Sequence, residues 1–217
     1  MYRRSKAHSD QLEQQRRIIA KQLASLLLQK QYVIFADESS TRIWHGKERL
    51  KKTWMHSDQP LSLKINSQGL KSITMIGATT NFTDRPILEI GPKSDLTSWK
   101  NFMLTLKQLL DELHITRKVY LVIDNLSAHH SRHMHQYYEP FKVIYIPAYS
   151  CEFNAQEFVW SALKQDLAKH FAGLNREIKQ QTDFEAEVDF VMTRFTRTHQ
   201  NAPFIRGIHA HLKKYTD

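Results

Sequence analysis

The sequence has 217 residues, 41% of them hydrophobic, which is enough for one folded domain or one domain with an extension. This apolar content excludes global disorder, and no apolar run reaches the roughly 18 residues that a membrane span needs. The first residues lack the apolar run of a secretory signal. The one cysteine, Cys151, excludes an internal disulfide and is typical of a cytoplasmic protein.

The formal net charge of +9 is concentrated in the first third of the chain. Residues 1–72 hold 14 Lys and Arg against 6 Asp and Glu, whereas residues 73–150 hold 8 against 7 and residues 151–217 hold 9 against 9. A localised basic surface predicts a polyanionic partner, with nucleic acid the first candidate. The alternative is a basic surface that only favours solubility. The candidate contact residues are Arg42, Lys47, Arg49, Lys51 and Lys52.

In chain order, hydrophobic periodicity predicts alternating helices and strands. Helices are expected at residues 9–30, 97–114, 131–138 and 154–171. Strands are expected at residues 32–37, 41–44, 50–54, 72–82, 119–124 and 142–146. Residues 175–217 alternate charged helical segments with a loop around Pro203.

The alternation of helix and strand in the second half predicts right-handed crossovers and parallel strands, after antiparallel strands in the first half. The fold class is therefore α/β, with a mixed five-stranded sheet and helices on both faces. Residues 1–31 are expected to form an N-terminal helical extension and residues 32–175 the sheet domain. Residues 176–217 are expected to form a C-terminal helical extension that packs on that domain.

Two apolar strands each end in a carboxylate. Tyr32–Ala36 leads into Asp37, and Val119–Ile123 leads into Asp124. Sites in such sheets gather at the carboxyl ends of strands, so the two aspartates lie side by side if their strands are neighbours. Adjacent carboxylates repel one another, and hard oxygen ligands suit Mg²⁺ or Mn²⁺. The alternative is that each aspartate only caps the loop that follows it.

A third carboxylate, Glu157, opens the last long helix, three residues after Asn154. These two residues have the spacing of a capping box, in which the glutamate accepts a hydrogen bond from the amide of the N-cap residue. However, Glu157 also lies one helical turn before Trp160, near the side of the helix that is expected to face the core. The residue is therefore either a helix cap or the third member of a carboxylate site.

Other polar residues near these carboxylates have simpler interpretations. Strand alternation places Glu38 on the face opposite Asp37, where a supporting role is expected. His129 is expected to contact phosphate or to orient Asp124. The neighbouring histidines suggest a zinc site, but no cysteine or fourth ligand completes one. Cys151 lies in the loop before Glu157, and no partnered base supports a role as nucleophile.

Taken together, these motifs resemble the catalytic domain of DDE transposases of the mariner superfamily, specifically the bacterial insertion-sequence branch. The family carries a strand that ends in Asp-Glu, matched by Asp37-Glu38, and a strand that ends in Asp-Asn, matched by Asp124-Asn125 with His129 following. Its Tyr-Ser-Pro-x-Leu-Asn-Pro-x-Glu-x-x-Trp segment is similar to residues 149–160. Between Asp124 and Glu157 lie 32 residues, close to the family's spacing.

The resemblance implies a ribonuclease H-like fold and a DDE catalytic domain at residues 32–175. It implies that Asp37, Asp124 and Glu157 are catalytic and bind two divalent ions, Mg²⁺ or Mn²⁺. The implied reaction is phosphodiester hydrolysis and strand transfer at transposon ends, with double-stranded DNA as the partner and a homodimer on that DNA. A protein of this kind is cytoplasmic and associates with the nucleoid when bound to DNA.

The sequence departs from the family pattern before the third carboxylate. Cys151 and Ala155 replace the two prolines of the segment, and Phe153 replaces its leucine. About 30 residues precede the first strand, which leaves no room for the family's DNA-recognition region. The chain therefore resembles a catalytic half, either a truncated copy or one of two reading frames, and in the second case a separate chain is expected to supply recognition. The alternative function is a non-catalytic, DNA-binding remnant of a transposase.

Overall fold

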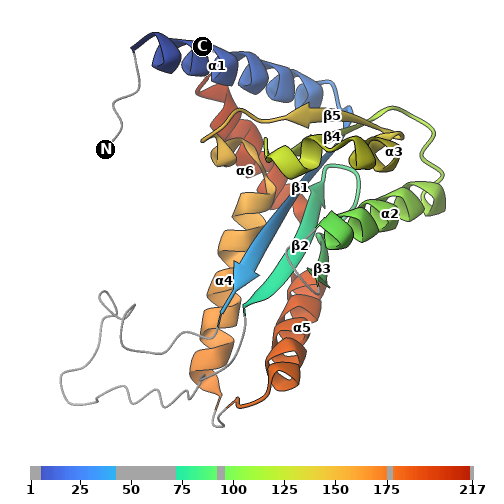
Figure 1. The fold of residues 1–217 in the computed structure, drawn as a ribbon, viewed down its shortest axis with the longest axis vertical. Coiled ribbons are helices and arrows are strands. Elements are labelled where there is room, and N and C mark those ends of the chain that lie inside the picture. The colour runs from blue at the N-terminus through green and yellow to red at the C-terminus, as the bar shows by residue number, and fades with distance from the viewer. Residues whose placement is uncertain (1–5, 43–71, 92–95, 175–177, 216–217) are drawn as a thin grey trace.

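The computed structural model describes residues 6–42, 72–91, 96–174 and 178–215 (Figure 1). In chain order its helices and strands are α1 (Lys6–Leu28), β1 (Tyr32–Thr41), β2 (Ile73–Thr80), β3 (Ile87–Gly91), α2 (Leu96–Glu112), β4 (Val119–Ile123), α3 (His135–Tyr138), β5 (Phe141–Tyr145), α4 (Gln156–Gly173), α5 (Gln181–Thr198) and α6 (Asn201–Lys213). Short 3₁₀ turns lie at Ser127–His130, Arg132–Met134 and Cys151–Phe153. Within this part of the chain, no helix combines the length and apolarity needed to cross a membrane.

The strands form one mixed five-stranded sheet, as expected, and their order in it is β3-β2-β1-β4-β5. β4 and β5 run parallel to β1, while β2 and β3 are antiparallel to their neighbours. β3 was not expected, because its five residues are bounded by glycine and proline and contain a glutamate. The expected strands at residues 41–44 and 50–54 lie largely outside the described residues, and Thr41 is the last residue of β1.

Helices cover both faces of the sheet. α2 and α3 pack on one face, where Trp99, Phe102 and Leu106 contact Ile34 and Leu121. The other face is covered by α1 and α6 over β1, β4 and β5, and by α4 and α5 over β2. β2 is buried along its whole length because it lies inside the sheet and has helices on both sides.

Three expected elements differ from the structure. β1 does not end at Asp37 but continues to Thr41, because pairing with β2 goes on after pairing with β4 has stopped. The loop expected around Pro203 is instead the first turn of α6. Proline is tolerated there, because amides in the first turn of a helix have no partner within the helix. The expected helix at residues 131–138 is a 3₁₀ turn followed by the single turn of α3.

Candidate active site

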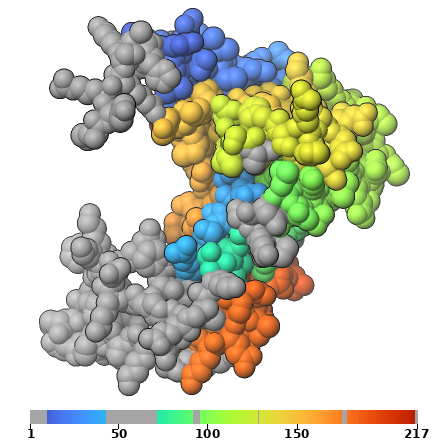
Figure 2. Space-filling view, in the orientation of Figure 1, coloured from blue at the N-terminus to red at the C-terminus, as the bar shows by residue number. Residues whose placement is uncertain are grey.

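Asp37 in β1 and Asp124 just after β4 lie at the same level of two neighbouring strands. The parallel register pairs Phe35 of β1 with Val122 of β4, and each aspartate follows two residues later. Asp37 lies on the same face of the sheet as Phe35, which α1, α4 and α6 cover, because alternate residues of a strand share a face. Asp124 follows directly after the last residue of β4. β1 and β4 stop pairing after Phe35 and Val122, so the two carboxylates lie where the strands separate. In the space-filling view the surface is hollowed where β1 and α4 reach it (Figure 2).

Glu157 lies in the first turn of α4, and buried side chains tie that turn to the sheet. The Nδ2 of Asn154 donates to the carbonyl of Ala36 across 3.0 Å, one residue before Asp37. The Oδ1 of Asn154 accepts from the backbone amide of Gln156, also at 3.0 Å. The side-chain oxygen of Gln156 accepts from Thr79 Oγ1 of β2 across 2.6 Å. The position of the helix start is therefore fixed relative to β1 and β2.

The capping box expected between Asn154 and Glu157 is not formed. The amide of Asn154 donates to the carbonyl of Cys151 across 2.9 Å, because the 3₁₀ turn just before it takes this hydrogen bond. The carboxylate of Glu157 instead interacts with the nearby thiol of Cys151, which favours its charged form. The geometry therefore removes the simple capping role that the sequence allowed for Glu157.

The three carboxylates act on one another electrostatically. Burial, together with the charges of Glu157 and Asp124, raises the pKa of Asp37 from its ordinary value of 3.8 to about 7. Burial and the charge of Asp124 raise the pKa of Glu157, although Lys164 and the Cys151 thiol oppose that rise. Such a cluster favours a bound cation, because a cation stabilises all three charged forms at once.

Trp160 lies one turn beyond Glu157 on α4 and contacts the first aspartate. Its indole Nε1 donates to Asp37 Oδ2 across 3.1 Å, and its ring is buried, as the sequence predicted. This hydrogen bond and one from the backbone amide of Glu38 both lower the pKa of Asp37. Sequence reasoning placed Trp160 in the core but missed this contact. The available signal was its spacing of three residues from Glu157.

His129 lies against the second aspartate. Its Nδ1 is 3.2 Å from Asp124 Oδ1, and its buried ring stacks on Trp99 with the ring centres 4.4 Å apart. This nitrogen lacks a well-aligned hydrogen bond, so the contact is mainly electrostatic. Burial lowers the pKa of His129, and the charge of Asp124 opposes this effect. Neighbouring His130 turns to a different partner, Asn125 Oδ1, at 2.6 Å.

The donor set fits a hard divalent cation, because all three side chains supply carboxylate oxygens. Among the described residues, no group of three or more His, Cys, Asp or Glu side chains already stands close enough together to hold a metal ion. Electrostatic influence reaches further than the roughly 2.1 Å of a magnesium–oxygen bond. Convergence on an ion therefore requires side-chain rotation, and the side chain of Asp124, 35% exposed, has room for it. No zinc site is formed by the described histidines.

Most of the basic residues expected to contact DNA lie outside the described residues. Lys47, Arg49, Lys51 and Lys52 belong to this group, and their contacts stay a prediction. Arg42 is described and is exposed just after the end of β1. Asp37 lies in β1, and Arg42 follows it by five residues along the chain.

A family model for DDE superfamily endonucleases matches residues 32–179 of this 217-residue chain. The chain belongs to the DDE superfamily of endonucleases. The matched segment of this DDE endonuclease begins at β1 and ends after α4, so it contains all three carboxylates. Comparison with curated proteins finds no match.

Solved structures share the fold of this DDE endonuclease. The catalytic domain of Mos1 mariner transposase aligns with a TM-score of 0.62 and 12% identity, over 99% of this chain and 93% of that domain. The Mos1 paired-end complex with the left transposon end aligns with a TM-score of 0.66 and 14% identity, over 99% of this chain and 62% of that one. The similarity confirms the ribonuclease H-like fold. The chain spans about three fifths of the transposase in such complexes.

Proposed function

We propose that this chain is the catalytic domain of a DNA transposase, which hydrolyses phosphodiester bonds and transfers strands at transposon ends. The observation that carries the proposal is the set of Asp37, Asp124 and Glu157 on a ribonuclease H-like sheet, mutually coupled through their charges. Family membership and the fold shared with Mos1 transposase support it. The bacterial insertion-sequence branch stays a prediction.

The proposed cofactors are two divalent ions, Mg²⁺ or Mn²⁺, held by the three carboxylates. In proteins with such sites, the ions activate a water or hydroxyl nucleophile and stabilise the leaving oxygen of the phosphodiester. Mos1 structures that share this fold were solved with Mg or Mn, which supports the choice of metal. The raised pKa of Asp37 independently supports a bound cation, because burial and neighbouring negative charges disfavour the ionised carboxylate unless a positive charge compensates it.

The remaining residues of the site have positioning roles. Trp160 fixes one oxygen of Asp37, and His129 restrains Asp124 from the side of Trp99. Asn154 ties the start of α4 to β1, so Glu157 keeps its place beside the first aspartate. These contacts hold the three acids on rigid elements, which keeps a reacting phosphate in a fixed position.

The proposed partner is double-stranded DNA, both transposon ends and target, bound by a homodimer. Solved complexes of Mos1 with paired transposon ends support this assembly. The surplus of positive charge in residues 1–72 supports phosphate contact by Arg42, Lys47, Arg49, Lys51 and Lys52. A separate chain is proposed to supply recognition of the terminal sequence. A cytoplasmic, nucleoid-associated location follows from this partner.

A cleavage assay tests the proposal. Labelled DNA from the ends of the element is incubated with the protein, with Mg²⁺, Mn²⁺ or EDTA, and with or without the product of the neighbouring reading frame. We expect nicking that requires metal and that is lost in Asp124→Asn. Metal-independent DNA binding without nicking under every condition, equal in wild type and variant, favours the non-catalytic remnant instead.

A further inference from the structure

The loop between β5 and α4 has a backbone that needs support from outside itself. Tyr149 adopts φ 58°, a left-handed conformation that is uncommon for a residue with a side chain. Its ring is 73% exposed, while the next residue, Ser150, is buried. A 3₁₀ turn at Cys151–Phe153 follows and leads into α4. Strained loops of this kind persist only where surrounding groups hold them in place.

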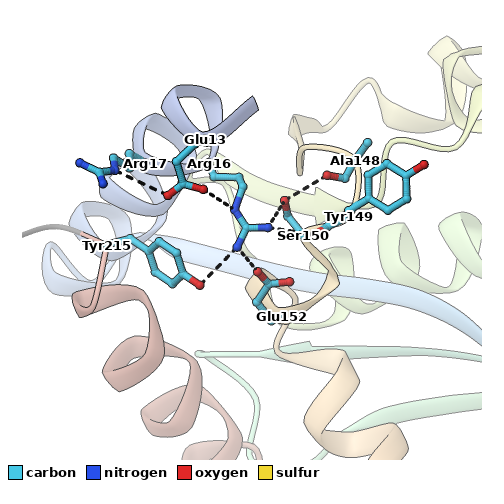
Figure 3. Close-up of polar contacts among 8 residues, drawn as sticks. All are labelled: Glu13, Arg16, Arg17, Ala148, Tyr149, Ser150, Glu152 and Tyr215. Carbon is cyan, nitrogen blue, oxygen red and sulfur yellow. Dashed lines mark hydrogen bonds and ion pairs between the residues drawn. The ribbon is translucent and has the colours of Figure 1, made fainter. Parts of the chain in front are cut away.

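Arg16 of α1 provides that support (Figure 3). Its Nη1 donates to the carbonyl of Tyr149 across 2.9 Å and lies 3.4 Å from Ser150 Oγ. Its Nη2 donates to Glu152 Oε1 across 2.5 Å and to the hydroxyl of Tyr215 across 3.3 Å. One guanidinium therefore contacts three of the loop residues from 149 to 152. A planar group with five N–H donors is suited to such a task, whereas an ammonium is not.

The Arg16 clamp, meaning the contacts of this guanidinium with Tyr149, Ser150, Glu152 and Tyr215, is partly buried and lies among aromatic rings. The side chain of Arg16 is 18% exposed, and its guanidinium lies 5.3 Å from the ring centre of Phe153 and 5.6 Å from that of Tyr215. Burial lowers the pKa of Arg16, but Glu152 and Tyr215 more than offset this, so the pKa is raised overall. A charge-assisted contact of this kind is stronger than an exposed ion pair, because water screens it less.

Arg16 and the tyrosine that it contacts both come from outside the segment that the family model matches. Arg16 precedes the matched residues 32–179, and Tyr215 follows them. α1 and α6 lie side by side, and Tyr215, just after α6, reaches Arg16 of α1 (Figure 1). The two flanking segments therefore meet at the loop, although neither contains a DDE carboxylate.

From the clamped loop, two contacts lead to the third carboxylate. The amide of Asn154 donates to the carbonyl of Cys151 across 2.9 Å, and the amide of Glu157 donates to the carbonyl of Asn154 across 3.2 Å. We propose that Arg16 is a positioning residue, which holds the loop so that Glu157 converges with Asp37 and Asp124 on a divalent cation. This inference rests on the proposed function of the carboxylates.

A plainer role for Arg16 is to fasten α1 to the rest of the domain. Arg17 offers a matched control, because it is the next residue of α1 and forms an ion pair with Glu13 at 3.6 Å, as Arg16 does at 3.3 Å. It is 64% exposed, and none of its recorded polar contacts in the described chain reaches the loop. Arg16→Gln and Arg17→Gln therefore remove the same charge from the same helix, but only Arg16→Gln removes the clamp.

Amide hydrogen exchange of the metal-free protein is the first measurement. In Arg16→Gln we expect faster exchange at Phe153 and Asn154, whose amides close the 3₁₀ turn. The strands of the sheet and the rest of α4 should keep their protection, and Arg17→Gln should resemble wild type. Arg16→Lys keeps the positive charge but lacks the planar set of N–H donors, so its effect should be intermediate. This variant also provides the test if Arg16→Gln folds poorly.

Binding of Mn²⁺ to the protein without DNA, followed by calorimetry, is the second measurement. We expect about tenfold weaker affinity in Arg16→Gln, the size of effect seen when a residue that orients a metal ligand is lost. Unchanged Mn²⁺ affinity with faster exchange along the whole of α1 overturns the inference and leaves a fastening role. If wild-type protein binds no Mn²⁺, the proposed function fails, and the exchange of the loop amides alone decides whether Arg16 holds the loop.

Discussion

The indole of Trp160 donates a hydrogen bond to Asp37 Oδ2 across 3.1 Å, from the first half of α4 to the middle of β1. The carboxylate that receives it is largely buried and lies near two other acids, so its charged form is otherwise disfavoured. The hydrogen bond favours that charged form, as does the backbone amide of Glu38. α4 therefore carries two features that act on the same aspartate in opposite directions, since Glu157 raises its pKa and Trp160 lowers it.

Replacing Trp160 by Phe tests this contact, because the ring stays and the donor is lost. We expect the pKa of Asp37 to rise above about 7, so that Mn²⁺ binding at neutral pH weakens and recovers at higher pH. The stability cost is about 1–2 kcal/mol. Calorimetric titration with Mn²⁺ between about pH 6.5 and 8.5 provides the measurement.

Trp99→Phe is the matched control for this variant. Trp99 is also buried, and its Nε1 donates to the hydroxyl of Tyr138 across 2.9 Å rather than to a carboxylate. A similar loss of stability is expected, but no change in the pH at which Mn²⁺ binds, because phenylalanine keeps an aromatic ring against His129. Equal pH profiles for Trp160→Phe and wild type would show that the indole does not control Asp37.

The raised pKa of Asp37 makes the stability of the metal-free protein depend on pH. Between its ordinary value of 3.8 and the folded value of about 7, the folded protein holds a proton that the unfolded chain has lost. Stability must therefore fall as pH rises through this range, by roughly 4 kcal/mol at most, and level off above it. Glu157, whose pKa is also raised, acts in the same direction.

Urea unfolding at about pH 5 and pH 8 measures this dependence. In EDTA, wild type should be less stable at pH 8, and Asp37→Asn should lose most of the difference because it has no proton to release. With saturating Mg²⁺ the loss at high pH should disappear, since the cation binds the ionised carboxylates of the folded state. A metal-free protein that is more stable at pH 8 would contradict the assigned shift.

Glu157→Gln separates charge from shape at the third carboxylate. The variant should not cleave DNA, because the amide cannot supply a charged ligand, yet it should bind DNA as wild type does. Metal-free stability should change by less than about 1 kcal/mol, because the lost repulsion with Asp37 offsets the altered contact with Cys151. Nicking assays and binding titrations on the same DNA measure the two properties.

Glu139→Gln, a change at an exposed carboxylate after α3, is the control and should keep cleavage. If Glu157→Gln cleaves like wild type, the third ligand must be sought elsewhere. Glu152 and Asp166 are the nearest acids in sequence, but Glu152 is engaged by Arg16 and Asp166 lies 4.0 Å from Lys169.

Much of the fold follows from local sequence patterns. The apolar runs before Asp37 and Asp124 predicted two strands of a mixed five-stranded sheet, and the aspartates were expected side by side only if these strands were neighbours. The structure shows that they are parallel neighbours, and the register of Phe35 with Val122 explains why the two aspartates lie level. The full length of β1 could not be predicted in this way. Its residues after Asp37 are polar, and they stay in the sheet only through tertiary pairing with β2.

The site was predicted less completely than the fold, because its supporting contacts cross long stretches of sequence. Periodicity indicated that Trp160 faces the core but not that it meets Asp37, which is 123 positions away. The capping box predicted for Asn154 fails for a similar reason, since its side chain reaches across to Ala36. Arg16 looked like an ordinary polar residue of an amphipathic helix, and only the folded chain brings it to Glu152.

His129→Ala tests whether the stacked histidine restrains Asp124. We expect a 10- to 100-fold loss of metal affinity or cleavage, the usual effect of removing a group that orients a metal ligand. Stability should also fall, because the ring fills a buried place against Trp99. His133→Ala is the control, since His133 is exposed and should be neutral. Equal cleavage by both variants would mean that Asp124 needs no restraint from this side.

The last prediction concerns the close packing behind Asp37. Gly77 of β2 pairs directly with Asp37, and a Cβ there would lie 2.5 Å from Gln156 Nε2 and 2.8 Å from Trp160 Cη2. Gly77→Ala must therefore push α4 away from the sheet, at a cost of about 1–3 kcal/mol. Both Glu157 and the indole that contacts Asp37 lie on α4, so metal affinity should fall together with stability.

Gly173→Ala provides the comparison, because a Cβ at Gly173 meets nothing within 4 Å. Gly173 is the last residue of α4, and alanine favours helix more than glycine does, so this variant should be as stable as wild type or slightly more so. Thermal unfolding and Mn²⁺ titration of both variants are the measurements. If Gly77→Ala lost stability but kept full Mn²⁺ affinity, the spacing between β2 and α4 would serve packing alone. If it lost both, the same spacing would also set the distance between Glu157 and the two aspartates.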